Sequence, residues 1–193
     1  MLNNFPFQVI LGSASPRRQD LLKLLDLPFK VIPINADEQF PSGLKADEIP
    51  LYLSEKKSFA FPVELKENEL LITSDTIVWH KNKVLNKPQN YAEAVDMLST
   101  LSGDMHEVFT GVCLRTAGMH KSFVDATRVF FRSLTMEEIE YYIQHYNVYD
   151  KAGAYGAQDW IGSVGIERIE GSYFNVMGLP VHRLYSALQQ INS

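Results

Sequence analysis

The stretch QVILGSASPRR, residues 8–18, decides how the fold begins. Gln8–Leu11 is a short, mostly apolar run typical of a buried strand, and Gly12 and Ser13 end it. Ser15 followed by Pro16 predicts a helix start, with serine as the N-cap and proline at the first helical position. We therefore expect a strand, a tight turn and a helix in immediate succession, as in α/β proteins.

Two arginines, Arg17 and Arg18, fall in the first turn of this expected helix. The helix N-terminus carries a partial positive charge, so each arginine costs about 0.3–1 kcal/mol there. A bound anion would offset that cost, and the guanidinium fork suits phosphate. The local sequence favours this anion site and two solvated surface arginines about equally.

The remainder of the chain alternates strand and helix patterns at first and then carries hairpin-like strands. Further strands are expected at 29–32, 70–73, 77–79, 83–85, 107–114, 122–132 and 164–169, and helices at 47–61, 91–101, 135–146 and 180–191. Lys81-Asn82 is expected to turn a hairpin, and Gly103 to cap a helix C-terminus. The pattern predicts an α/β fold with a mixed, twisted β-sheet flanked by helices.

Composition limits the function classes. The 193 residues suit one domain over 1–193 or two small lobes sharing a cleft, and 46% hydrophobic residues supply a core without disulfides. The single cysteine, Cys113, lies in an apolar run. A net charge of −5 disfavours a nucleic-acid partner. No basic leader or run of roughly 20 apolar residues occurs, so we expect a cytoplasmic protein without a membrane partner.

Two acidic positions are candidates for metal or acid–base chemistry. Asp75 lies in the polar run Thr73–Thr76 between apolar segments, where a carboxylate could bind a divalent cation or act as a general base. A strand-end turn, with the aspartate capping its own backbone, is the alternative. Glu38, next to Asp37 in an irregular segment, could supply a second carboxylate, although an ordinary acidic loop is the more frequent case.

Candidate ligand contacts also occur further along the chain. Lys56 and Lys87 are possible phosphate partners, although solvated lysines are common. The small-residue loop 151–158 would let a ligand approach the backbone, and Gln158 could pair with a base edge; a flexible surface loop is the alternative. Neither common nucleotide-binding glycine motif is present, and the five histidines lack zinc spacing.

Taken together, these motifs resemble one family in order along nearly the whole chain. The motifs are SASPRR at 13–18, DE at 37–38, EK at 55–56, SDT at 74–76, KP at 87–88, LSG at 101–103, HEV at 106–108, TG at 110–111, DKAGAYG at 150–156 and GLP at 178–180. They are similar to those of the Maf family of nucleotide pyrophosphatases.

The resemblance implies a fold related to inosine triphosphate pyrophosphatases, with a cleft between two lobes. It also implies hydrolysis of nucleoside triphosphates to a monophosphate and pyrophosphate with a divalent cation, Mg²⁺ or Mn²⁺. The implied phosphate-binding residues are Ser13, Arg17, Arg18, Lys56 and Lys87. Glu38 and Asp75 are implied to hold the metal or activate water.

Substrate choice separates two branches of the family, one acting on dTTP and UTP and the other on 7-methyl-GTP. The loop 151–158 is similar to the dTTP/UTP branch, in which the positions of Arg17, Thr76 and Gln158 are linked with substrate choice. Asp37 departs conservatively from the glutamate that often precedes Glu38.

Two mechanistic readings follow from the resemblance. In the first, water attacks the α-phosphorus in line, and Asp75 accepts the proton or positions the metal. In the second, the chain is a nucleotide-binding regulator of cell division or septum formation without catalysis, which would need the phosphate site but not both carboxylates. The sequence leaves monomer and homodimer open.

Overall fold

The computed structural model describes residues 5–191 as strands joined by helices. The strands are β1 Gln8–Leu11, β2 Phe29–Val31, β3 Glu69–His80, β4 Lys83–Leu85, β5 Met105–Arg115, β6 His120–Phe131 and β7 Ile166–Glu170. The helices are α1 Pro16–Lys23, α2 Glu48–Phe59, α3 Tyr91–Leu101, α4 Met136–His145, α5 Trp160–Gly165, α6 Tyr173–Met177 and α7 Val181–Ile191, with a 3-10 turn, η1, at Ala152–Ala154.

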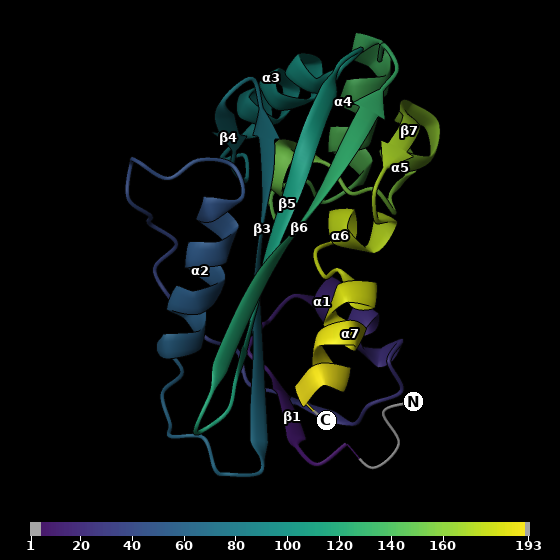
Figure 1. Ribbon diagram of the computed structural model, residues 1–193. Coiled ribbons are helices and arrows are strands. Elements are labelled where there is room, and N and C mark those ends of the chain that lie inside the picture. The colour runs from purple at the N-terminus through teal and green to yellow at the C-terminus, as the bar shows by residue number, and fades with distance from the viewer. Residues whose placement is uncertain (1–4, 192–193) are drawn as a thin grey trace. The chain divides into compact units, whose positions relative to one another are not determined.

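Within these residues, seven strands form one sheet in the order β2-β1-β3-β5-β6-β7, with β4 paired to β3 off this path (Figure 1). Strand β1 runs parallel to both β2 and β3. The β3–β4 and β6–β7 pairs are antiparallel. The mixed sheet flanked by helices that the sequence predicts is therefore confirmed.

The chain divides into two compact units, and β3, β5 and β6 contribute residues to both. The first unit comprises the chain up to Asp75, Thr110–Asp125 and the chain from Gly178 onward, and the second comprises Thr76–Phe109 and Ala126–Met177. The single domain expected over 1–193 and the cleft between two lobes stay predictions.

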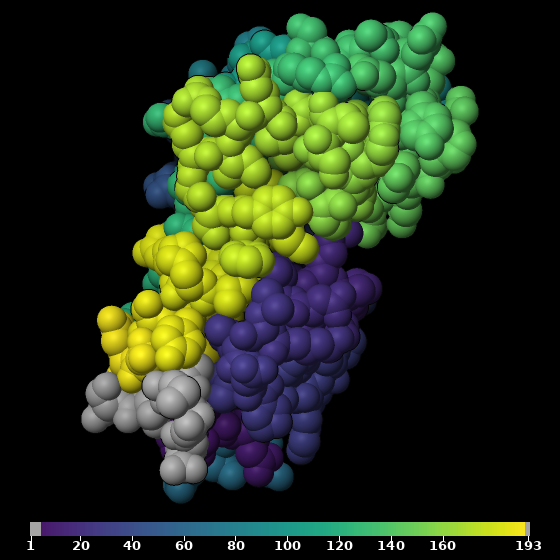
Figure 2. All heavy atoms as spheres, turned by 90° about the vertical axis from the view of Figure 1, so that its right-hand side faces the viewer, coloured from purple at the N-terminus to yellow at the C-terminus, as the bar shows by residue number. Residues whose placement is uncertain are grey.

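In the first unit, helices cover both faces of the strands. Figure 1 shows α2 on one side of these strands and α7 on the other. Figure 2 shows the C-terminal helix, in yellow, packed beside the N-terminal segment, in purple. Ile10 and Leu71, from neighbouring parallel strands, form a buried cluster with Phe61 and Leu65. The short strand β1 thus lies inside the unit, as its apolar composition predicts.

The second unit has its core between the helices α3 and α4 and the segment that follows α4. Leu98 of α3 and Tyr142 of α4 are fully buried there together with Ile161 of α5. Helix α4 begins with the expected capping box, in which the Thr135 hydroxyl accepts from the Glu138 amide and the Glu138 carboxylate accepts from the Thr135 amide. This cap sets where α4 starts and so where Tyr142 points.

Several expectations about local structure need correction. The polar run Thr73–Thr76 is not a turn, because β3 continues through it without a break. Its hydroxyl groups find partners outside the strand: the Thr73 hydroxyl, for example, donates to the Ser54 carbonyl at 2.7 Å. Gly103 has the left-handed φ of 71°, but its amide donates to the Arg132 carbonyl rather than back to the helix.

Other expectations hold or need small changes. The hairpin at Lys81-Asn82 is confirmed, and both residues adopt the positive φ angles of a tight hairpin turn. Short helices α5 and α6 were not expected from the sequence. The segment 151–157 is not a flexible surface loop, since most of its residues are buried. No helix among residues 5–191 is long and apolar enough to cross a membrane.

Candidate functional site

The turn between β1 and α1 has the predicted geometry. Pro16 opens the helix, and the Ser15 side chain accepts a hydrogen bond from the Arg18 amide. The Ser15 amide in turn donates to the Ser13 hydroxyl at 3.2 Å, which holds the buried Ser13 side chain at the helix entrance. The positive end of the α1 dipole therefore lies next to a fixed hydroxyl, an arrangement suited to an anion.

The Arg18 side chain is part of this turn and is not a solvated surface group. Its Nε donates to the Gly178 carbonyl at 2.9 Å, and its guanidinium reaches the Ser13 hydroxyl at 3.5 Å. Burial lowers the pKa of Arg18, the Asp75 carboxylate acts in the opposite direction, and the charge of Arg17 lowers the pKa further. The two half-buried arginines thus place concentrated positive charge at the helix start.

Strand β3 distributes its polar side chains on alternate faces, as the period of two in a strand requires. The Thr73 hydroxyl donates to the Ser54 carbonyl of α2, whereas the Ser74 hydroxyl donates to the Gly178 carbonyl at 3.3 Å. Asp75 points toward α2, where its carboxylate accepts a hydrogen bond from the Lys57 ammonium. The Gly178 carbonyl thereby ties β3 to the α1 turn, and Asp75 stands on the α2 face.

Lys57 joins the two candidate acids. Its Nζ lies 2.5 Å from Asp75 Oδ1 and 2.8 Å from Glu38 Oε1. The side chains of Lys57 and Asp75 are only 12% and 9% exposed, so this contact is shielded from water, whereas Glu38 is 53% exposed. The structure therefore brings Glu38 and Asp75 to one point, as their assignment to a common site predicts.

The neighbouring lysine, Lys56, has a different environment. Its Nζ lies 3.1 Å from Asp37 and donates to the Gln39 carbonyl at 2.8 Å. Successive helical residues point about 100° apart, so Lys57 and not Lys56 reaches the Glu38 and Asp75 carboxylates. The predicted phosphate-binding role of Lys56 stays a prediction. Lys57 is the functional candidate that the sequence prediction missed.

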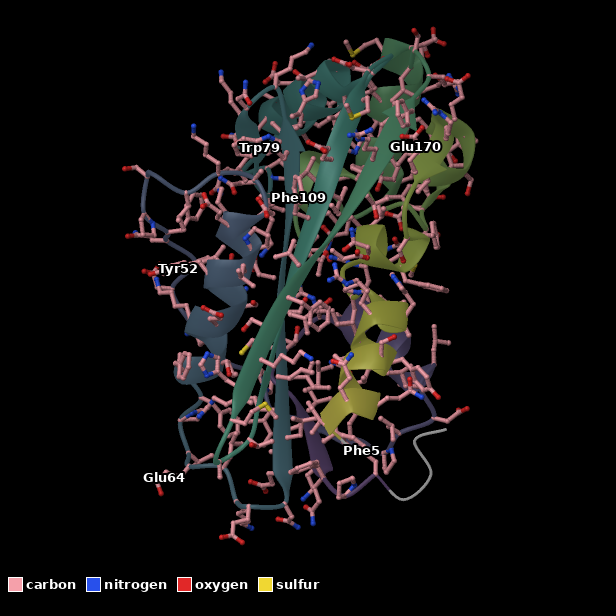
Figure 3. The ribbon with its side chains drawn as sticks, in the orientation of Figure 1. Phe5, Tyr52, Glu64, Trp79, Phe109 and Glu170 are labelled. Carbon is pink, nitrogen blue, oxygen red and sulfur yellow. The ribbon has the colours of Figure 1, made fainter. Side chains whose placement is uncertain are left out.

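Helix α2 lies very close to β5, and this closeness brings Lys57 to Asp75. A Cβ on Gly111 of β5 would stand 2.1 Å from the Pro50 carbonyl oxygen of α2, so only glycine fits. Tyr52, on the outer side of α2, points away from the strands (Figure 3) and is 37% exposed. The opposite face of the helix carries Ser54 and Lys57 toward the sheet.

Three further candidates belong to the second unit. Thr76 is a half-buried residue within β3, Lys87 is exposed after β4, and Gln158 is exposed after the buried segment 153–157. The approach of these residues to the site in the first unit stays a prediction.

The first unit therefore combines two kinds of chemistry. Ser13, Arg18 and the start of α1 can hold phosphate oxygens. Asp75 and Glu38 offer carboxylate oxygens, which Mg²⁺ prefers, and one or two carboxylates suffice when substrate phosphates supply other ligands. No cluster of three or more histidine, cysteine or acidic ligands occurs among residues 5–191.

A likeness to one solved structure supports the fold. The Ham1 protein of Staphylococcus aureus aligns with 96% of this chain and 100% of its own, with a TM-score of 0.50 and 13% sequence identity. At this identity the likeness concerns the fold alone.

Other proteins have a much higher sequence identity to this chain. Proteins named dTTP/UTP pyrophosphatase are 50% identical over 184 residues in Christiangramia forsetii and 49% identical over 193 residues in Phocaeicola vulgatus. These alignments cover 95% and 99% of this chain, and 94% and 100% of the relatives. The family model described as Maf-like protein matches residues 8–191. A match of that length, with relatives about half identical from end to end, shows that the chain belongs to the Maf family.

Proposed function

We propose that this chain is a nucleoside triphosphate pyrophosphatase that hydrolyses dTTP and UTP to the monophosphate and pyrophosphate. Relatives about half identical over nearly the whole chain carry that name. The observation that carries the proposal is the convergence of Asp75 and Glu38 on Lys57, in the unit that also holds Arg18 at the start of α1.

Phosphate binding in this proposal begins at the turn between β1 and α1. Ser13, Arg17 and Arg18 hold phosphate oxygens there, with help from the partial positive charge of the helix start. Lys56 and Lys87 are proposed as additional phosphate partners. Positive charge fixed at these points stabilises the negative charge that develops on the leaving pyrophosphate.

A divalent cation, Mg²⁺ or Mn²⁺, fits the donor set of Asp75 and Glu38. Two carboxylates that already converge on one ammonium group can also converge on a metal ion. When bound, such an ion would polarise phosphate oxygens and ease deprotonation of water.

The chemical step follows from the same residues. A water oxygen attacks the α-phosphorus, the bond from that phosphorus to the bridging oxygen breaks, and pyrophosphate leaves. Asp75 takes the proton that the water loses. In the protein without a cation, Lys57 holds Asp75 in place through the 2.5 Å contact and keeps the nearby acids from repelling one another.

Base selection is proposed to involve Arg17, Thr76 and Gln158. We also propose that the protein acts in the cytoplasm on free nucleotides, since a net charge of −5 disfavours a polymeric anion. A homodimer is compatible with this function.

The test is a pyrophosphate-release assay on purified protein with Mg²⁺ or Mn²⁺. The panel contains dTTP, UTP, dCTP, CTP, ATP, GTP and 7-methyl-GTP, with dTTP and UTP expected to react fastest. Asp75→Asn should lower kcat by about 10²–10⁴-fold with the fold retained, the usual contribution of a general base. Asp20→Asn, which alters an exposed aspartate paired with Lys23, is the matched control.

Two results would count against the proposal. Near-normal turnover in the folded Asp75→Asn variant would remove Asp75 from the chemistry. Nucleotide binding without release of pyrophosphate from any triphosphate would favour the regulator without catalysis.

A further inference from the structure

A tight turn in the second unit presents Gln158. The Asp159 amide donates to the Gly156 carbonyl at 3.0 Å, which closes a four-residue β-turn with Gln158 at its third position. Residues 153–157 are buried, and Gln158, which follows them, is exposed. A rigid, buried support fixes the point from which the Gln158 side chain extends.

One hydroxyl group holds both ends of this turn. Tyr142 Oη accepts from the Gly156 amide at 3.1 Å and donates to Asp159 Oδ2 at 2.6 Å. Tyr142 is fully buried on α4, so its ring cannot move without disturbing the core of the unit. The first and last residues of the turn are therefore tied to a fixed point.

The Asp159 side chain bonds the Tyr142 hydroxyl and does not cap its own helix. Asp159 is the N-cap of α5, where an aspartate usually caps the helix, but its side chain makes no cap hydrogen bond. The carboxylate instead accepts from Tyr142 and lies 3.6 Å from the Lys151 ammonium, whose side chain is 10% exposed. The Asp159 carboxylate thus holds the turn instead of capping α5.

The other side of the turn is fixed by close packing. A Cβ on Gly162 of α5 would stand 2.1 Å from the Ala157 carbonyl oxygen, so α5 fits directly against the residue before Gln158. Tyr142 holds the ends of the turn, and α5 supports its middle.

The geometry points to Tyr142 and Asp159 as positioning residues that hold the turn from which the Gln158 side chain reaches the base, and that thereby influence the choice of base. This inference rests on the proposed function and deepens it. The glutamine amide carries one acceptor and a donor group. Uracil and thymine present an N–H donor between two carbonyl acceptors, whereas cytosine lacks that N–H donor. A Gln158 amide whose oxygen faces that N–H can therefore favour UTP and dTTP over CTP and dCTP.

The first experiment measures kcat/KM for UTP and CTP with Tyr142→Phe, which removes the hydroxyl and keeps the ring. The UTP-to-CTP ratio is expected to fall about threefold to tenfold, the range of one net hydrogen bond, mainly through UTP. In a background of Gln158→Ala, Tyr142→Phe should lower the ratio no further, because Tyr142 affects base selection only through Gln158.

Conservative substitution at Asp159 gives the second experiment. Asp159→Asn retains a carbonyl oxygen for Tyr142 and should keep most of the selectivity, whereas Asp159→Ala should lose it. This pair tests the inference even if Tyr142→Phe fails to fold, and thermal unfolding of each variant monitors the fold.

The outcomes separate the inference from the function on which it rests. An equal loss of kcat/KM for UTP and CTP would overturn the positioning role, and so would additive effects of Tyr142→Phe and Gln158→Ala. Neither result would contradict the proposed pyrophosphatase activity. Absence of pyrophosphate release by the unmodified protein would overturn both.

Discussion

Replacing Gly111 by alanine tests how closely α2 must approach β5. The added Cβ would lie 2.1 Å from the Pro50 carbonyl oxygen, 2.4 Å from its carbonyl carbon and 2.7 Å from the Leu51 nitrogen. All three atoms belong to the backbone, so no side-chain rotation relieves the contact. The first distance is about 1.3 Å short of a normal contact between non-bonded atoms. Helix α2 therefore has to move outward by roughly that amount.

Movement of α2 has two measurable consequences. Overpacking of this kind costs about 1–3 kcal/mol, which corresponds to a decrease in Tm of roughly 2–12 °C for a domain of this size. The same movement separates Lys57 from Asp75, which now lie 2.5 Å apart, and weakens the Thr73 hydrogen bond to Ser54. Because a small misplacement of a catalytic group can cost about 10²-fold in rate, activity should fall more than stability alone explains.

The assay combines thermal unfolding with pyrophosphate release at a temperature where each variant is folded. Gly43→Ala is the matched control, because a Cβ at Gly43 meets no atom within 4 Å. A Tm of Gly111→Ala within 1 °C of the Gly43→Ala value, with normal kcat, would refute the requirement for close approach of the helix and strand.

Three further predictions concern charge. The hydrogen bond from Arg132 lowers the pKa of Glu138 to about 2. Its stabilising effect should be present above the ordinary pKa of 4.5 and be lost as pH falls toward 2; Glu138→Gln should remove this part of the pH dependence of the free energy of unfolding. Burial lowers the pKa of His106 to about 3, so below its ordinary 6.5 the unfolded chain gains a proton that the folded chain excludes. Stability should therefore fall between pH 6.5 and pH 3, and His106→Gln should flatten that decline in denaturant titrations. Finally, Lys57→Met should reduce kcat more than Lys56→Met, since Lys57 contacts both site carboxylates whereas Lys56 contacts Asp37; equal losses in the release assay would contradict this.

Signals between residues close in sequence predicted the turn between β1 and α1 well. Ser15 and Pro16 specify a helix start through contacts within a few residues, and the structure has that start at the expected place. The two arginines after it were ambiguous in the sequence, because their interpretation depends on distant partners. The Gly178 carbonyl that receives the Arg18 hydrogen bond lies 160 positions further along the chain.

Non-local contacts explain where the sequence prediction was incomplete. The run Thr73–Thr76 has the composition of a turn, yet it continues a strand because α2 and Gly178 supply partners for its hydroxyl groups. The segment 151–157 has the composition of a flexible loop, yet Tyr142 binds the Gly156 amide within the core. In both cases a distant group bonds a polar side chain or a backbone amide that the local sequence alone would place in a turn or loop.

Helical periodicity could have identified Lys57 as a residue on the buried face of α2. The buried residues of α2 are Ile49, Pro50, Leu53, Ser54 and Ser58, a stripe with the three- and four-residue spacing of one helix face. Lys57 follows Leu53 by four positions and Ser54 by three, so it belongs to that stripe, whereas Lys56 lies beside it. The stripe was hard to recognise because a proline and two serines occupy positions where apolar residues would normally reveal it. Those small side chains let α2 come close to β5, and that closeness allows the lysine on the buried face to reach Asp75.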